Sequence, residues 1–134
     1  MIEKIKINGD TAALIIRSSY SKDEGIEFFT KDEDTLQLGY MKRMKGYEIQ
    51  PHTHVSIPRK VEYTNEVLFI KSGKVKINFY DKSCEYINSC ILLKDDVVLL
   101  TTSGHGFEMI EDSEIIEVKQ GPYVGENDKY RFNK

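Results

Sequence analysis

The sequence feature that most restricts the fold is an alternation of polar and apolar side chains that recurs between turn signals. It is clearest at Lys74–Tyr80, where Val75, Ile77 and Phe79 alternate with polar residues. Successive side chains of a strand point to opposite faces, so this pattern predicts a strand with one buried face. No stretch carries a helical period for more than a single turn. The sequence therefore predicts an all-β fold.

The predicted strands follow one another along the whole chain. They lie at residues 4–7, 12–16, 25–30, 36–44, 67–70, 74–80, 86–93, 97–100 and 114–120, with two further strands between Pro51 and Pro58 and from 105 to 109. Asn8-Gly9 is a hairpin turn signal, because asparagine and glycine adopt positive φ readily. The run 97–100 is apolar on both faces, so we expect both to be covered. In the last strand Ile116, Val118 and Gln120 share one face, which we expect to point inward.

The composition excludes several classes of protein. A chain of 134 residues supports one core, and 19 basic against 22 acidic residues leave no basic footprint for nucleic acid. No apolar stretch approaches the roughly 20 residues that span a bilayer, and the N-terminus lacks a signal-peptide core, so we expect a cytoplasmic protein with no membrane partner. Cys84 and Cys90 are too few for a disulfide framework, and Cys90 fits a small buried hydrophobe.

The three histidines of the chain fall in two short segments. His52 and His54 stand two residues apart on a predicted strand, so they point the same way, as two ligands of one metal ion must. His105 lies in Ser103-Gly-His-Gly-Phe107, just after the apolar run 97–100. This spacing, with a glutamate in register, favours a metal site over unrelated core or surface histidines.

These residues resemble the first motif of the cupin superfamily, which is a glycine, five residues, His-x-His, and a glutamate seven positions before another glycine. Gly46, His52, His54, Glu66 and Gly73 occupy these places. The second motif is matched in part: the family pattern opens Gly-Asp and has Pro-x-Gly before its histidine, whereas this chain has Asp95-Asp96 and then residues 101–104.

The resemblance covers roughly residues 38–120. It implies a double-stranded β-helix, or jelly-roll, barrel formed by residues 37–134 with a C-terminal tail, and a short N-terminal β extension, 1–36, in the same domain. It also implies a set of four metal ligands: His52, His54, Glu66 and His105.

One departure from the family pattern affects the choice of carboxylate. Cupins usually have three or four residues between the second histidine and the glutamate, whereas residues 55–65 intervene here. This insertion contains Glu62, a rival ligand. Glu66 is preferred because it opens the apolar run 67–70 and keeps its spacing to Gly73, and Glu62 is the alternative.

Three imidazoles and one carboxylate suit one divalent transition metal per chain. Iron(II) is favoured, and manganese, nickel, zinc and copper are compatible, whereas the absence of thiolates disfavours a purely structural zinc site. Four protein ligands leave coordination positions open to a substrate, water or dioxygen.

Other residues are candidates for contact with a small-molecule ligand. Arg59, in the insertion, suits an anionic group. Phe107 shares the parity of His105 and Met109 and fits either core or ligand contact. Gln120 is a further substrate-binding candidate. Catalytic candidates that could orient a ligand or move a proton are Tyr63, Gln120 and Tyr123.

Two classes of function are open. One is a metalloenzyme, an isomerase, epimerase or dioxygenase, acting on a small polar oxygen-rich molecule of the sugar or sugar-acid type. The other is a non-catalytic sugar or small-ligand binding module with a structural metal. A metal-free cupin epimerase is a minor alternative, which the complete ligand set disfavours. Residues 117–123 are similar to a stretch of small cupins, some of them linked to polysaccharide or nucleotide-sugar pathways. Exposed edges of the N-terminal strands predict a homodimer.

Overall fold

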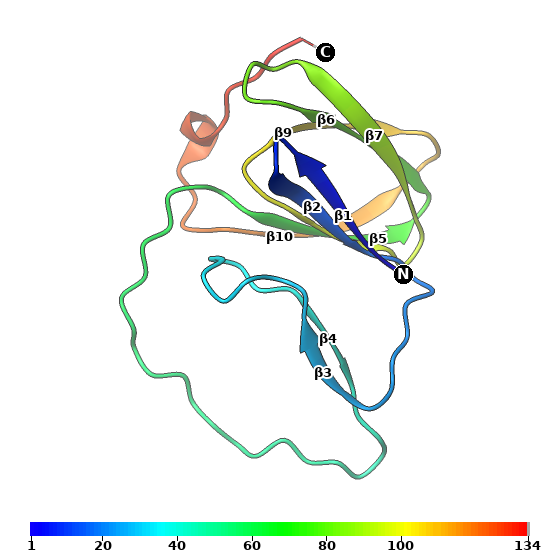
Figure 1. Ribbon diagram of the computed structural model, residues 1–134, viewed down its shortest axis with the longest axis vertical. Coiled ribbons are helices and arrows are strands. Elements are labelled where there is room, and N and C mark those ends of the chain that lie inside the picture. Colours follow the sequence, from blue (N-terminus) through cyan, green and yellow to red (C-terminus); the bar gives the residue numbers. More distant parts are fainter. Residues whose placement is uncertain (134) are drawn as a thin grey trace. The chain divides into compact units, whose positions relative to one another are not determined.

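The computed structural model describes residues 1–133, which form β-strands joined by turns and loops (Figure 1). The strands are β1 (Ile2–Ile7), β2 (Asp10–Ile16), β3 (Gly25–Phe28), β4 (Gly39–Lys42), β5 (Glu66–Ser72), β6 (Lys74–Tyr80), β7 (Tyr86–Leu93), β8 (Val97–Leu100), β9 (Gly104–Met109) and β10 (Glu114–Lys119). A 3-10 helix, η1 (Gly125–Asp128), follows β10, and the described residues contain no α-helix. The all-β prediction is confirmed. No helix in the described part of the chain is long and apolar enough to cross a membrane.

The chain divides into two compact units. Unit 1 comprises Met1–Tyr20 and the chain from Tyr63 onward, and unit 2 is Ser21–Glu62. The grouping of residues 1–36 as an N-terminal extension stays a prediction; of its strands, β1 and β2 lie in unit 1 and β3 lies in unit 2.

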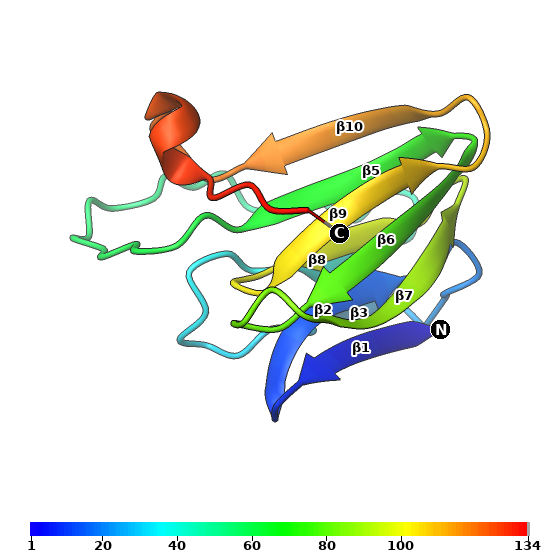
Figure 2. The same ribbon diagram turned by 90° about the horizontal axis from the view of Figure 1, so that it is seen from above.

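Unit 1 contains two antiparallel sheets (Figure 2). The five-stranded sheet has the order β1-β2-β8-β5-β10, and the three-stranded sheet has the order β7-β6-β9. Among residues 1–133 the strands form no closed barrel, so the closed double-stranded β-helix stays a proposal. β9 and β10 are edge strands, each hydrogen-bonded to a single neighbour.

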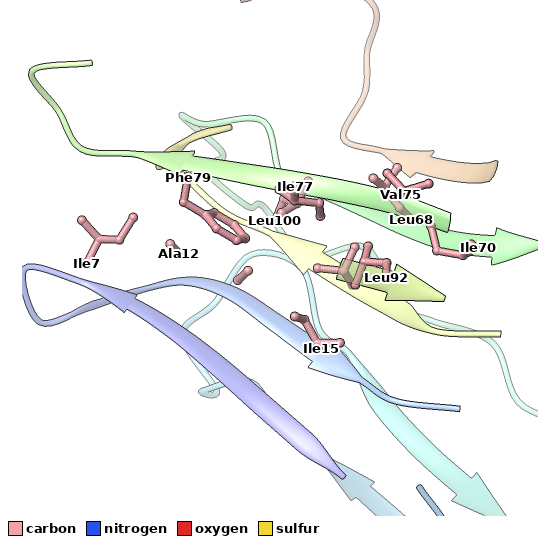
Figure 3. Close-up of a cluster of buried hydrophobic side chains, with 12 residues drawn as sticks. Ile7, Ala12, Ile15, Leu68, Ile70, Val75, Ile77, Phe79, Leu92 and Leu100 are labelled. Atoms are coloured by element: carbon pink, nitrogen blue, oxygen red, sulfur yellow. The ribbon is translucent and has the colours of Figure 1, made fainter. Parts of the chain in front are cut away.

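The core of unit 1 lies between the inner faces of these two sheets (Figure 3). On β6 the side chains of Val75, Ile77 and Phe79 are at most 1% exposed, and they cluster with Ile15 of β2 and Leu68 of β5. Each such side chain contributes roughly 1.5–3 kcal/mol on burial. The predicted strand 74–80 is confirmed, both in its bounds and in its buried side.

The outer face of the five-stranded sheet is apolar as well. Two rows of directly opposed residues cross four strands: Leu14, Leu99, Val67 and Val118, and Ile16, Val97, Phe69 and Ile116. The expectation that β8 is covered on both faces is confirmed, because Val98, Leu99 and Leu100 are all buried.

The predicted orientation of the last strand is wrong. Ile116 and Val118 lie on the outer face and are more than half exposed, while Ile115 packs against the core. The register of β10 against β5 shifts between Glu114 and Ile115, which places Ile115 opposite Ile70 of the inner face. Since this irregularity lies in the pairing, alternation along the strand alone could not reveal it.

A buried carboxylate ties the start of the chain to the β7–β8 turn. Asp96, 2% exposed, accepts hydrogen bonds from Arg17 and from the backbone N–H groups of Ser18 and Leu93. Partial burial lowers the pKa of Arg17, but hydrogen bonds to Asp96 and Glu3 outweigh it and raise that pKa above its usual value. Arg17 therefore stays charged, and the buried charge of Asp96 is compensated.

Cys90 lies at the margin of the core rather than wholly inside it. Its side chain is half-buried and packs against the core cluster of unit 1. Burial raises the pKa of its thiol, which disfavours the reactive thiolate at neutral pH. Both cysteines are free.

Unit 2 consists of the β3–β4 hairpin and a long segment without strands. β4 covers only Gly39–Lys42 of the predicted strand 36–44, and β3 ends at Phe28. Residues 43–65 contain no strand, so the strand predicted between Pro51 and Pro58 is not formed. Proline donates no backbone hydrogen bond, and without a paired neighbour a local alternation does not make a strand.

Candidate metal site

Glu66 is the first residue of β5, at the end of the inner face of the five-stranded sheet. Alternation along β5 puts it on the same face as the buried residues Leu68 and Ile70. Its side chain is only 13% exposed. The local sequence explains this position, because the apolar run that follows Glu66 forms a strand whose alternate residues enter the core.

His105 reaches the same region from the opposite sheet. It lies on β9 directly opposite Phe79 of β6, and opposed residues of an antiparallel pair share a face, so its imidazole is on the inner face. The His105 Nε2 atom is 3.8 Å from the Glu66 Oε2 atom. Two residues far apart in the sequence thus meet between the sheets of unit 1.

The tautomer of His105 is fixed by its other ring nitrogen. The Nδ1 atom lies 3.1 Å from the carbonyl oxygen of Ser103, and a carbonyl can only accept, so Nδ1 donates. In the neutral ring Nε2 then presents a lone pair toward Glu66. Ligating histidines usually donate their second N–H to such an acceptor.

The spacing of this pair suits a cation between the two groups. A charge-assisted hydrogen bond between histidine and carboxylate would be roughly 2.7–2.9 Å long, shorter than the 3.8 Å between Nε2 and Oε2. Two ligands each about 2.1 Å from one ion lie at most about 4.2 Å apart. The 3.8 Å between Nε2 and Oε2 lies within this limit, so Glu66 and His105 remain candidates for two ligands of one metal ion.

His52 and His54 lie in unit 2, in the segment without strands. Their ring centroids are 5.3 Å apart, and both residues are exposed. His52 Nδ1 lies 2.8 Å from the carbonyl oxygen of Gln50, two residues earlier, as His105 does with Ser103. In both rings the Nδ1 atom is engaged by a backbone carbonyl, which leaves Nε2 as the atom that could bind a metal ion. In neither unit of the described chain do three or more His, Cys, Asp or Glu side chains form a metal-sized group.

The two candidate carboxylates have different surroundings. Glu62 is exposed in unit 2 and forms an ion pair of 2.8 Å with Lys60. Glu66 is mostly buried in unit 1 and faces His105. Since Glu62 already has a cationic partner whereas Glu66 faces an imidazole, Glu66 remains the preferred carboxylate.

The remaining candidates are scattered over both units. Arg59 is exposed in the strandless part of unit 2, and in unit 1 Tyr63 and Tyr123 are exposed as well. Phe107 and Met109 share the inner face of β9 with His105 but, at this sheet edge, remain 39% and 50% exposed, so neither is a core residue. The Oε1 atom of Gln120 is buried and has no hydrogen-bond partner within the described residues.

Sequence reasoning missed Lys119. It lies on β10 directly opposite Glu66, so the two side chains share the inner face. Its Nζ atom is 3.8 Å from a carboxylate oxygen of Asp128 in η1, and Asp128 in turn accepts a hydrogen bond from the hydroxyl of Thr64. Its position beside Glu66 follows from the register of β10 against β5. The register shift between Glu114 and Ile115 hides this pairing from alternation along the sequence.

Comparison of the chain with protein-family models, curated proteins and solved structures gave no match. The case for a function therefore rests on the residues and their geometry.

Proposed function

We propose that the chain is a metal-binding protein of the cupin kind, a double-stranded β-helix that holds one divalent transition metal. The proposed ligands are His52, His54, Glu66 and His105. The observation that carries the proposal is the pair of Glu66 and His105, in which Oε2 and Nε2 lie 3.8 Å apart. The other ring nitrogen of His105, Nδ1, is hydrogen-bonded to the backbone carbonyl of Ser103. The His-x-His spacing, and the matching carbonyl contact of His52, support the other two ligands.

The favoured activity is that of a metalloenzyme acting on a small polar, oxygen-rich molecule such as a sugar or sugar acid. A divalent metal, with iron(II) favoured, supplies Lewis-acid polarisation of a ligand oxygen or, as iron, activation of dioxygen. Isomerase, epimerase and dioxygenase chemistry all fit this class. The residues proposed to orient the ligand or move a proton are Tyr63, Gln120 and Tyr123, with Arg59 and Phe107 as further ligand contacts.

The second candidate is a non-catalytic sugar or small-ligand binding module in which the metal is structural. The observation that favours it is the exposure of the proposed proton-transfer residues, 64% for Tyr63 and 87% for Tyr123. A catalytic acid or base is usually withdrawn from water, because burial tunes its pKa. Turnover of a sugar acid by the metal-loaded protein would decide for the enzyme.

The proposal is tested by measuring metal content per chain after purification without added metal. Glu66→Gln should lower metal occupancy several-fold, because it removes the ligand charge that offsets the cation, while Glu62→Gln should remain near wild type. The two variants are matched in chemistry and differ only in position. Equal occupancy in both variants, or the reverse order, would show that the carboxylate was chosen wrongly, and metal-free wild-type protein would refute the proposal itself.

A further inference from the structure

The inner face of the five-stranded sheet carries a cation beside the candidate metal site. Lys119 is the direct cross-strand partner of Glu66, which places their Cβ atoms about 4.5–5.5 Å apart on one face. Glu66 in turn faces His105. Lys119 therefore extends from the strand position next to one of the two proposed ligands.

The surroundings of Lys119 hold its side chain in this region. Asp128 lies 3.8 Å from Nζ and is itself hydrogen-bonded by Thr64, the second residue before Glu66. Asp128 belongs to η1, which follows β10 after residues 120–124 (Figure 2). The side chains of Lys119 and Asp128 are 32% and 23% exposed. Partial burial strengthens the electrostatic effect of a charge placed here.

The same pair of strands contains a lysine in a different setting. Lys71 of β5 lies 3.9 Å from Glu114 of β10, near the opposite end of the strand pair, and the two side chains are 59% and 66% exposed. This ion pair resembles that of Lys119 in chemistry and length but lies in solvent, far along the strand from Glu66. Lys71 is therefore a matched control for Lys119.

The ammonium group of Lys119 has unused hydrogen-bond donors. A lysine ammonium group carries three N–H donors, and the 3.8 Å between Nζ and Asp128 is longer than a hydrogen bond. Within residues 1–133, Nζ makes no hydrogen bond of ordinary length. An ammonium group with free donors is suited to bind an anionic oxygen.

The balance of charges around Lys119 and the candidate metal site also favours an anionic ligand. Glu66 offsets one of the two charges of a divalent ion, and Asp128 offsets Lys119, so a net positive charge remains when the ion is bound. Glu117, two residues before Lys119 on the same face, is exposed and therefore screened by water. An anionic ligand would balance the remaining charge.

We propose that Lys119 is a specificity residue that binds an anionic oxygen, from a carboxylate or a phosphate, of the small molecule held at the Glu66–His105 site. This inference rests on the proposed function and narrows its substrate class to anionic molecules. It assigns to Lys119, in the well-packed unit 1, a role that the sequence suggested for Arg59.

The test is calorimetric titration of the metal-loaded full-length protein at low ionic strength with three probes: glucuronate, glucose 6-phosphate and glucose. Wild-type protein should bind at least one of the two anions more tightly than glucose, and the stronger of the two identifies the source of the anionic oxygen. Lys119→Gln should weaken that binding about tenfold or more, the effect of losing one charge-assisted contact, without lowering the metal content. Lys119→Arg should retain part of the affinity, and Lys71→Gln should match wild type.

Other outcomes separate this inference from the proposed function. If Lys119→Gln binds both anions as tightly as wild type, or if wild type prefers glucose or binds none of the probes, the role of Lys119 is refuted. If wild-type protein binds an anion through Lys119 but contains no metal, the metal proposal fails while the anion site stands. If wild-type protein contains metal but the Lys119 variants bind the anions as wild type does, the anion site fails while the metal proposal stands.

Discussion

At the scale of single residues, Gly73 shows how the absence of a side chain fixes a turn. It joins β5 to β6 with a φ of 90°, a left-handed conformation that glycine adopts without strain. A Cβ atom at this position would lie 2.2 Å from the Ser113 hydroxyl oxygen and 2.4 Å from the Asp112 carbonyl oxygen. Both the conformation and the available space therefore require glycine.

We expect Gly73→Ala to lower the free energy of unfolding by about 2–5 kcal/mol, the sum of the left-handed strain and a steric clash. Gly46→Ala is the matched control, because Gly46 has a φ of 91° and nothing within 4 Å of an added Cβ. It should cost only the backbone strain, about 1–2 kcal/mol. Urea unfolding of both variants measures the difference, and equal costs would contradict the close packing of Gly73 against Ser113.

At the scale of elements, the β6–β7 pair illustrates how alternation decides which residues stabilise the fold. Ile77 of β6 is fully buried, whereas Ile91 of β7 lies opposite Lys76, on the other face, and is 39% exposed. Ile77→Ala should therefore destabilise unit 1 by about 2–5 kcal/mol through the cavity it leaves, and Ile91→Ala by less than about 1 kcal/mol. Chemical denaturation measures both variants. A larger loss for Ile91→Ala would contradict the orientation of β6 and β7.

At the scale of the whole molecule, the apolar outer face of the five-stranded sheet bears on assembly. Ile116 and Val118 of β10 are more than half exposed there, beside Val67 and Phe69 of β5. Contiguous exposed apolar side chains are characteristic of interaction surfaces. Lys71 and Glu114, which pair with each other, lie near this face. Because they carry opposite charges, a two-fold contact between two copies of the face need not bring like charges together.

We therefore propose that the chain is a homodimer and expect light scattering to give about twice the chain mass of 15.5 kDa. Val118→Asp should shift the protein toward monomer, because a charge would be buried in the apolar contact. Lys94→Asp is the control, since Lys94 is exposed in the β7–β8 turn and belongs to neither apolar row of this face. A monomeric wild-type protein, or a dimer indifferent to Val118→Asp, would refute this arrangement.

The sequence by itself determined the class of fold and many of the strands. β6, β7 and β8 have the predicted bounds, and the Asn8-Gly9 turn has the positive φ values that its residues favour. These features depend on near neighbours in the chain, either through alternation over a few residues or through the conformational freedom of a turn residue. The sequence also singled out Glu66 and His105, although their role as ligands stays a proposal.

Only the tertiary structure decided how the parts are paired. In the tertiary structure Glu66 lies beside His105, and Lys119 lies opposite Glu66. The side chain of Ile115, rather than that of Ile116, packs against the core. Each of these facts depends on the register between strands distant in the sequence, and a one-residue shift reverses which side chains face inward. The strand predicted around His52 failed for a related reason: alternation marks a segment able to pair, but a strand exists only where another strand accepts its hydrogen bonds.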